Sequence, residues 1–145
     1  MSLLPWEPDR PLSLETARSV VRAAFPWIQA ETLDFLGSGW EFDAYWSGGW
    51  VIRFPRRAEA AELFELERPI LELVRSVLPS SVRVPEVSVA ERPVGGFPYL
   101  FSAHPYIAGV SADQIDPCLR PQLARSLGRA LAAVHGIPEV QARAP

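Results

Sequence analysis

The hydrophobic pattern of the first third of the chain predicts one helix followed by three strands. Residues 13–25 carry apolar side chains at helical spacing, with Ser13 in position to cap the helix and Pro26 directly after its end. Alternating or apolar runs then predict strands at 32–36, 42–46 and 50–54. Because short glycine-containing segments separate these strands, we expect an antiparallel meander.

The middle of the chain predicts a long helix and two further strands. Residues 58–78 repeat at helical spacing, and their predicted apolar face consists of Leu63, Phe64, Ile70, Leu71, Val74 and Leu78. Pro69 lies within this helix and predicts a kink or two abutting helices. The segments 87–90 and 99–104 read as strands, joined by a hairpin-like loop at 92–96.

The last part of the chain predicts a helix that ends at His135 and Gly136. It carries an apolar stripe made of Leu119, Leu123, Leu127, Leu131 and Val134. The predicted fold is therefore α+β, with a five-stranded antiparallel sheet, a packed helix and a C-terminal helix.

Composition narrows the possible functions. The 145 residues are 48% hydrophobic and 21% charged, which is typical of a soluble globular domain. The net charge of −3 argues against broad nucleic-acid binding, and the single cysteine, Cys118, excludes an intramolecular disulfide. The chain has no apolar run long enough to cross a membrane and no secretory pattern at its start, so we expect a cytoplasmic protein.

Three features could carry chemistry. The segment Gly37–Ser38–Gly39 could present backbone N–H groups to an anion, although an ordinary hairpin turn has the same composition. Arg53, on a strand beside that segment, could hold phosphate oxygens, or could be an exposed surface arginine. Glu67 lies between Leu63 and Leu71 on an apolar row, where a carboxylate needs a partner.

Arg53 is the expected partner of Glu67, with Glu65 as the other candidate for the carboxylate and an exposed Glu67 as the alternative. Arg56 and Arg57 follow in a loop and are expected to be solvated. The segment 102–107 could offer backbone hydrogen bonds to a planar ring, or could simply link a strand to a helix. The two histidines and Cys118 form no recognisable catalytic or metal-binding pattern, so no catalytic or metal-binding residue is assigned.

The order of these motifs resembles the N-terminal lobe of the aminoglycoside and macrolide phosphotransferases, which have a protein-kinase-like fold. The resemblance runs from about Thr32 to Pro138. It is carried by Leu36–Tyr45, Trp50–Arg57, Glu67, Val82–Pro85, the hinge-like Phe101–Gly109, Leu127–Leu131 and Leu131–His135.

The resemblance implies a role for each matching position. Gly37, Ser38 and Gly39 would form the loop over the nucleotide phosphates, and Arg53 stands where kinases carry a phosphate-binding lysine, with Glu67 as its helix partner. This replacement is not conservative, because a guanidinium differs from an ammonium in shape and hydrogen bonding. The positions that would line the purine pocket are Ala103, His104, Tyr106 and Ile107.

The resemblance also implies a domain division and a function. Residues 1–109 would form the lobe, with 1–30 as a leading helical segment, and 110–145 would form a linker and the helix that opens a second lobe. In the family that second lobe carries the catalytic groups and the magnesium ligands. We therefore expect this chain to bind ATP or GTP weakly or not detectably, and not to phosphorylate the hydroxyl of a small-molecule acceptor.

Two other interpretations remain. The chain could be a self-standing, non-catalytic interaction domain derived from a kinase lobe, with self-association through the helix at 117–135. It could also be an unrelated α+β domain whose motifs agree by chance.

Overall fold

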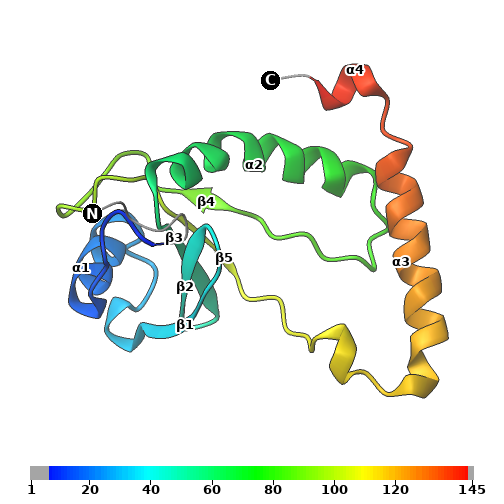
Figure 1. Cartoon of the computed structure of the whole chain (residues 1–145), viewed down its shortest axis with the longest axis horizontal. Helices are drawn as coiled ribbons and strands as arrows, with labels where there is room; N and C mark the ends of the chain where they lie inside the picture. Colours follow the sequence, from blue (N-terminus) through cyan, green and yellow to red (C-terminus); the bar gives the residue numbers. More distant parts are fainter. Residues whose placement is uncertain (1–6, 144–145) are drawn as a thin grey trace. The chain divides into compact units, whose positions relative to one another are not determined.

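A computed structural model describes residues 7–143 of the chain (Figure 1). The chain divides into two compact units, described here one after the other. Among the described residues, the first comprises 7–67 and 86–106, and the second comprises 68–85 and 107–143. The division of the chain at residue 109 into a lobe and a following segment remains a prediction.

The first helix, α1 (Leu14–Ala24), forms where the sequence predicts it. The Ser13 side chain accepts a hydrogen bond of 3.1 Å from the backbone N–H of Thr16, which caps the helix. Ala17, Val20 and Val21 are fully buried, so the apolar face of α1 is a major part of the core.

Three consecutive strands form the predicted meander: β1 (Asp34–Ser38), β2 (Phe42–Ser47) and β3 (Trp50–Pro55), paired antiparallel. Gly48 and Gly49 have φ angles of 54° and 86° and connect β2 to β3 in a two-residue turn. Such a turn requires positive φ at both positions, which glycine adopts without strain.

The first strand begins later than predicted. Residues Ala30–Thr32 form a short 3₁₀ helix, η1, in which the Thr32 hydroxyl donates to the Gln29 carbonyl at 3.0 Å. This local hydrogen bond competes with strand pairing, so β1 starts at Asp34 and extends through Gly37 and Ser38. The predicted strand at 32–36 is therefore wrong in its bounds.

Two short strands complete the sheet, β4 (Ser88–Val89) and β5 (Ser102–Pro105). The strand order is β1-β2-β3-β5-β4, and every neighbouring pair is antiparallel, which confirms the predicted five-stranded sheet. The predicted strand at 87–90 is one residue too long at each end, and the predicted strand at 99–104 begins three residues too early and ends one residue short of Pro105.

The two faces of the sheet differ in character. Tyr45, Ile52, Phe54 and Ala103 are buried in one hydrophobic cluster with the apolar face of α1. Side chains alternate along β3, so Arg53 projects from the opposite face. The sheet therefore buries a conventional core on one face and presents a charged side chain on the other.

The loop before β5 packs closely against α1. A tight turn at Gly95 and Gly96 brings Val94 and Phe97 together as an isolated pair. A β-carbon added at Gly95 would lie 2.8 Å from Cγ1 of Val20. Glycine is thus required there both by the positive φ of 59° and by the approach of α1.

The long helix, α2 (Ala58–Val77), continues through Pro69, so the two abutting helices considered for this segment do not form. Its predicted apolar face is confirmed only in part, since Phe64 is buried and Leu71, Val74 and Leu78 are half-buried. Ala60 and Phe64 are buried, whereas Leu63 and Ile70 are 42% and 55% exposed. The row that is turned inward is Ala60, Phe64 and Glu67, one turn of the helix apart at each step, because Phe64 packs against Phe42 of β2.

In the second unit, the C-terminal part of α2 is tied to the segment after it, since Arg75 Nη2 donates to the Pro85 carbonyl at 2.7 Å. The short helices η2 (Ala112–Gln114) and η3 (Pro117–Leu119) lead into α3 (Arg120–His135) and α4 (Glu139–Ala142). The predicted final helix is thus confirmed, and it contains no buried residue. Among the described residues, no helix is both long and apolar enough to cross a membrane.

Candidate functional site

Arg53 and Glu67 form the centre of the candidate site. Arg53 Nη2 donates to Glu67 Oε2, and the same nitrogen lies 3.2 Å from the hydroxyl oxygen of Ser102, which pairs with Arg53 across β3 and β5. The two charged side chains are 20% and 25% exposed, so both are largely withdrawn from water. The predicted pair is confirmed, and Glu67 rather than Glu65 is the partner.

Two aromatic rings that contact each other lie against the guanidinium of Arg53. Its central carbon lies 5.2 Å from the centre of the Phe42 ring and 5.5 Å from that of Phe64. At these distances the ring faces attract the cation, and they also restrict its rotation. The Arg53 Nε atom is buried and has no hydrogen-bond partner, so the guanidinium keeps a donor that the protein does not satisfy.

The glycine segment is placed differently from the prediction. Gly37 and Ser38 lie within β1, and the turn itself consists of residues 39–41. The Ser38 hydroxyl donates to Asp43 Oδ1 at 2.6 Å, and Asp43 stands opposite Phe54 in the β2–β3 register. Because cross-strand partners share a face, this hydrogen bond lies on the core face, and the structure does not bring the Ser38 side chain together with Arg53.

The hinge-like segment begins in β5. Ala103 pairs with Ile52 on one side and Ser88 on the other, while His104 pairs with Val51 alone among the described strand residues. The backbone of β5 therefore has an unpaired edge from His104 onward. Tyr106 continues the segment, and its N–H donates to the Gly49 carbonyl at 2.7 Å, whereas Ile107 belongs to the second unit.

Sequence reasoning missed the roles of Arg56 and Arg57. These side chains are only 15% and 17% exposed, so the expectation that they are solvated is wrong. Arg56 Nη1 donates to Asp43 at 2.8 Å, and Arg57 Nη2 donates to both carboxylate oxygens of Glu41, at 2.9 and 2.8 Å. The sequence held one signal for these ion pairs: two acids, Glu41 and Asp43, lie in the hairpin that precedes the two adjacent arginines.

Comparison with known proteins agrees with this arrangement. The family model of APH, the phosphotransferase enzyme family, matches residues 32–145, which is most of the chain. The chain belongs to the phosphotransferase enzyme family. No curated protein sequence matches the chain.

Solved structures of aminoglycoside phosphotransferases share the fold of this family member. The GDP complex of wild-type aminoglycoside 2′-phosphotransferase-IIIa has a TM-score of 0.71 at 21% identity, over 84% of this chain and 42% of that one. The GDP and kanamycin complex of the APH(2″) type IIIa enzyme has a TM-score of 0.72 at 22% identity, over 90% of this chain and 44% of that one. The chain thus spans less than half the length of these relatives.

Proposed function

We propose that this chain is the nucleotide-binding part of a phosphotransferase that moves the γ-phosphoryl group of ATP or GTP to a hydroxyl of a small, antibiotic-type molecule. Family membership supports the reaction class. The solved relatives are complexes with GDP and, in one case, with GDP and kanamycin, which supports a nucleotide and an aminoglycoside-like acceptor.

The observation that carries the proposal is the state of Arg53. Its cation is oriented by Glu67 and Ser102 and lies against the rings of Phe42 and Phe64. Because the side chain is already held in one orientation, binding an anion costs less conformational entropy than it would for a freely moving arginine. Phosphate oxygens match a guanidinium in charge and geometry, so Arg53 fits a nucleotide phosphate.

Two backbone segments supply the rest of the proposed site. The turn that follows Gly37 and Ser38, with Gly39 at its start, would cover the phosphates through backbone N–H groups other than that of Gly39, which donates to the Phe42 carbonyl. The Ser38 hydroxyl is engaged by Asp43 and would not take part. The unpaired edge of β5 that begins at His104, next to Ala103 and followed by Tyr106, would read the purine edge. The magnesium that accompanies the nucleotide is assigned no ligand in this chain.

The proposal predicts weak nucleotide binding and no phosphoryl transfer by the 145-residue chain, because the chain matches less than half the length of the solved relatives. We would titrate the isotope-labelled chain with GTP and with ATP and follow amide chemical shifts. Shifts centred on 37–39, 53 and 103–107, abolished in Arg53→Met, support the proposal. An absence of shifts up to millimolar nucleotide, or shifts confined to other residues, would contradict it.

A second proposal concerns association. The α3 side chains Leu123, Leu127 and Leu131 are 36%, 55% and 47% exposed, and an apolar stripe of this kind is usually covered in solution. We infer that a second copy of the chain covers it, which is the interaction-domain alternative. Light scattering at increasing concentration tests this: a mass that stays monomeric in the wild type, or a dimer that Leu127→Glu leaves intact, rules the association out.

A further inference from the structure

We propose that Arg57 is a positioning residue, which holds the turn at 39–41 in place and thereby sets the environment of Arg53. This inference rests on the proposed function, since it concerns the same phosphate-binding surface. It deepens that function by giving a role to an arginine outside the pair formed by Arg53 and Glu67.

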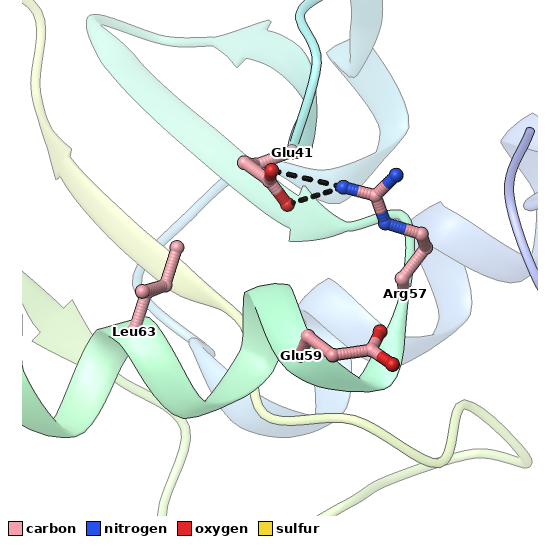
Figure 2. Close-up of a pocket in the computed structure, with 4 residues that line it drawn as sticks. All are labelled: Glu41, Arg57, Glu59 and Leu63. Carbon is pink, nitrogen blue, oxygen red and sulfur yellow. Dashed lines mark hydrogen bonds and ion pairs between the residues drawn. The ribbon is translucent and has the colours of Figure 1, made fainter. Parts of the chain in front are cut away.

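The contacts of Arg57 concentrate on the turn. One nitrogen of its guanidinium bonds both carboxylate oxygens of Glu41, as Figure 2 shows, and its central carbon lies 5.9 Å from the centre of the Trp40 ring. Two of the three turn residues are therefore held by a single side chain. Arg57 is 17% exposed and Glu41 is 32% exposed, so water screens this ion pair less than it screens a surface pair.

Backbone hydrogen bonds and a second ion pair also hold the turn at 39–41 in place. The N–H of Arg56 donates to the Glu41 carbonyl at 2.8 Å, and the Gly39 N–H donates to the Phe42 carbonyl at 2.8 Å. Arg56 also pairs with Asp43 at 2.8 Å. The connection between β3 and α2 thus holds the turn by its backbone and by charged side chains on both sides of Phe42.

Phe42 links this turn to the site. It directly follows Glu41 in the chain, packs against Phe64 with ring centres 5.0 Å apart, and faces the Arg53 guanidinium at 5.2 Å. Releasing Glu41 from Arg57 loosens the residue before Phe42, and therefore the ring that limits the motion of Arg53. The ion pair lines an open pocket of about 430 Å³ together with Glu59 and Leu63, so the turn has space to move into once the pair is broken.

Hydrogen exchange, without any nucleotide, measures whether Arg57 holds the turn at 39–41 in place. The amides of Gly39 and Arg56 are the reporters, because each donates one of the bonds that close the turn. We expect Arg57→Met to speed their exchange about fivefold and to leave the Ile52 amide, in the centre of the sheet, unchanged. Arg57→Lys keeps a cation and one nitrogen donor, and since the contact uses one nitrogen, it should restore most of the protection.

Nucleotide titration measures whether the position of this turn affects binding at Arg53. Arg57→Met should raise the dissociation constant for GTP about fivefold, while Arg57→Lys stays within twofold of the wild type. The matched control is Arg68→Met, which removes an exposed arginine–glutamate pair with Glu72 on α2 and should change neither reporter amide nor affinity.

The outcomes separate this inference from the proposed function. Unchanged exchange at Gly39 and Arg56 in Arg57→Met overturns the inference alone. Faster exchange with an unchanged dissociation constant also overturns it, because the turn would then be held without any consequence for binding. A wild-type chain that binds neither ATP nor GTP contradicts the proposed function, and the nucleotide role of Arg57 with it.

Discussion

Arg53 of β3 and Glu67 of α2 are joined by a hydrogen-bonded ion pair that connects the sheet to the long helix. Neither charge is fully exposed, and the rings of Phe42 and Phe64 exclude water from one side of the cation. The pair therefore has two consequences. It fixes the orientation of the proposed phosphate-binding group, and it makes the stability of the fold depend on both partners being present.

Removing only the acid should be costly. Glu67→Gln leaves the partly buried Arg53 without a counter-charge, so we expect a loss of about 2 kcal/mol in the free energy of unfolding, measured by urea denaturation. Glu65→Gln changes an exposed glutamate two positions away and should alter stability by less than about 0.5 kcal/mol. Equal effects of the two substitutions would show that the ion pair has no special role.

Removing both charges should cost less than removing one. Arg53→Met places an apolar side chain against Phe42 and Phe64, so the double variant with Glu67→Gln should recover about 1 kcal/mol or more of the stability lost in Glu67→Gln alone. The same double variant should bind no nucleotide. Recovered stability with lost binding is the combination that distinguishes a functional arginine from a structural one.

The sequence predicts this pair for a sound reason, although the helical phase was wrong. A carboxylate among apolar residues requires a partner, and Arg53 stood on the nearest strand. The row that contains Glu67 is nevertheless Ala60, Phe64 and Glu67 and not the row of Leu63. Periodicity alone cannot choose between neighbouring rows when both carry apolar side chains.

Other features depended on contacts that no local pattern encodes. The orientation of Ser38 follows from the strand register, which shifts between Phe35 and Gly37, and that irregularity has no sequence signature here. The burial of Arg56 and Arg57 depends on acids brought opposite them by the hairpin. The overall sheet was predictable because turn glycines and alternating apolar residues act locally.

Asp9 should stabilise the start of α2. Its Oδ2 accepts from the backbone N–H of Ala58 and from the Tyr99 hydroxyl, each at 3.2 Å. Asp9→Ala removes this cap and should lower the free energy of unfolding by about 1 kcal/mol, whereas Asp9→Asn keeps an acceptor and should cost only a few tenths. Tyr99→Phe isolates the hydroxyl contact. A harmless Asp9→Ala would show that the cap contributes nothing.

Tyr45 should make the protein sensitive to alkali. Burial raises its pKa above the ordinary value of 10.0, and the nearby charge of Asp43 adds to the effect. The unfolded chain then loses this proton at a lower pH than the folded chain, so the stability is intact below pH 10 and falls as the pH rises through the folded pKa.

The chain is well suited to that measurement because it contains no lysine and its arginines keep their charge. Urea midpoints between about pH 8 and pH 11 should fall in the wild type and fall less steeply in Tyr45→Phe. Burial also raises the pKa of Tyr99. Tyr99 is therefore a smaller source of the pH dependence that remains in the Tyr45→Phe variant. Identical slopes in both proteins would mean that Tyr45 ionises equally easily in the folded and unfolded states.

Gly95 and Gly96 provide a matched test of close packing against α1. Both have positive φ, at 59° and 82°, so alanine is strained at either position by about 1 kcal/mol. Only at Gly95 does the new β-carbon meet another atom, Cγ1 of Val20 at 2.8 Å, while nothing lies within 4 Å of the one at Gly96. Val20 is a β-branched residue on a helix and cannot readily change rotamer to make room.

We therefore expect Gly95→Ala to cost about 3 kcal/mol and Gly96→Ala about 1 kcal/mol, measured by urea unfolding. Val20→Ala removes the obstructing methyl group, so the excess cost of Gly95→Ala should largely disappear in that background even though Val20→Ala is itself destabilising. If the two glycine variants prove equally unstable, the loop does not pack on α1 as closely as 2.8 Å requires.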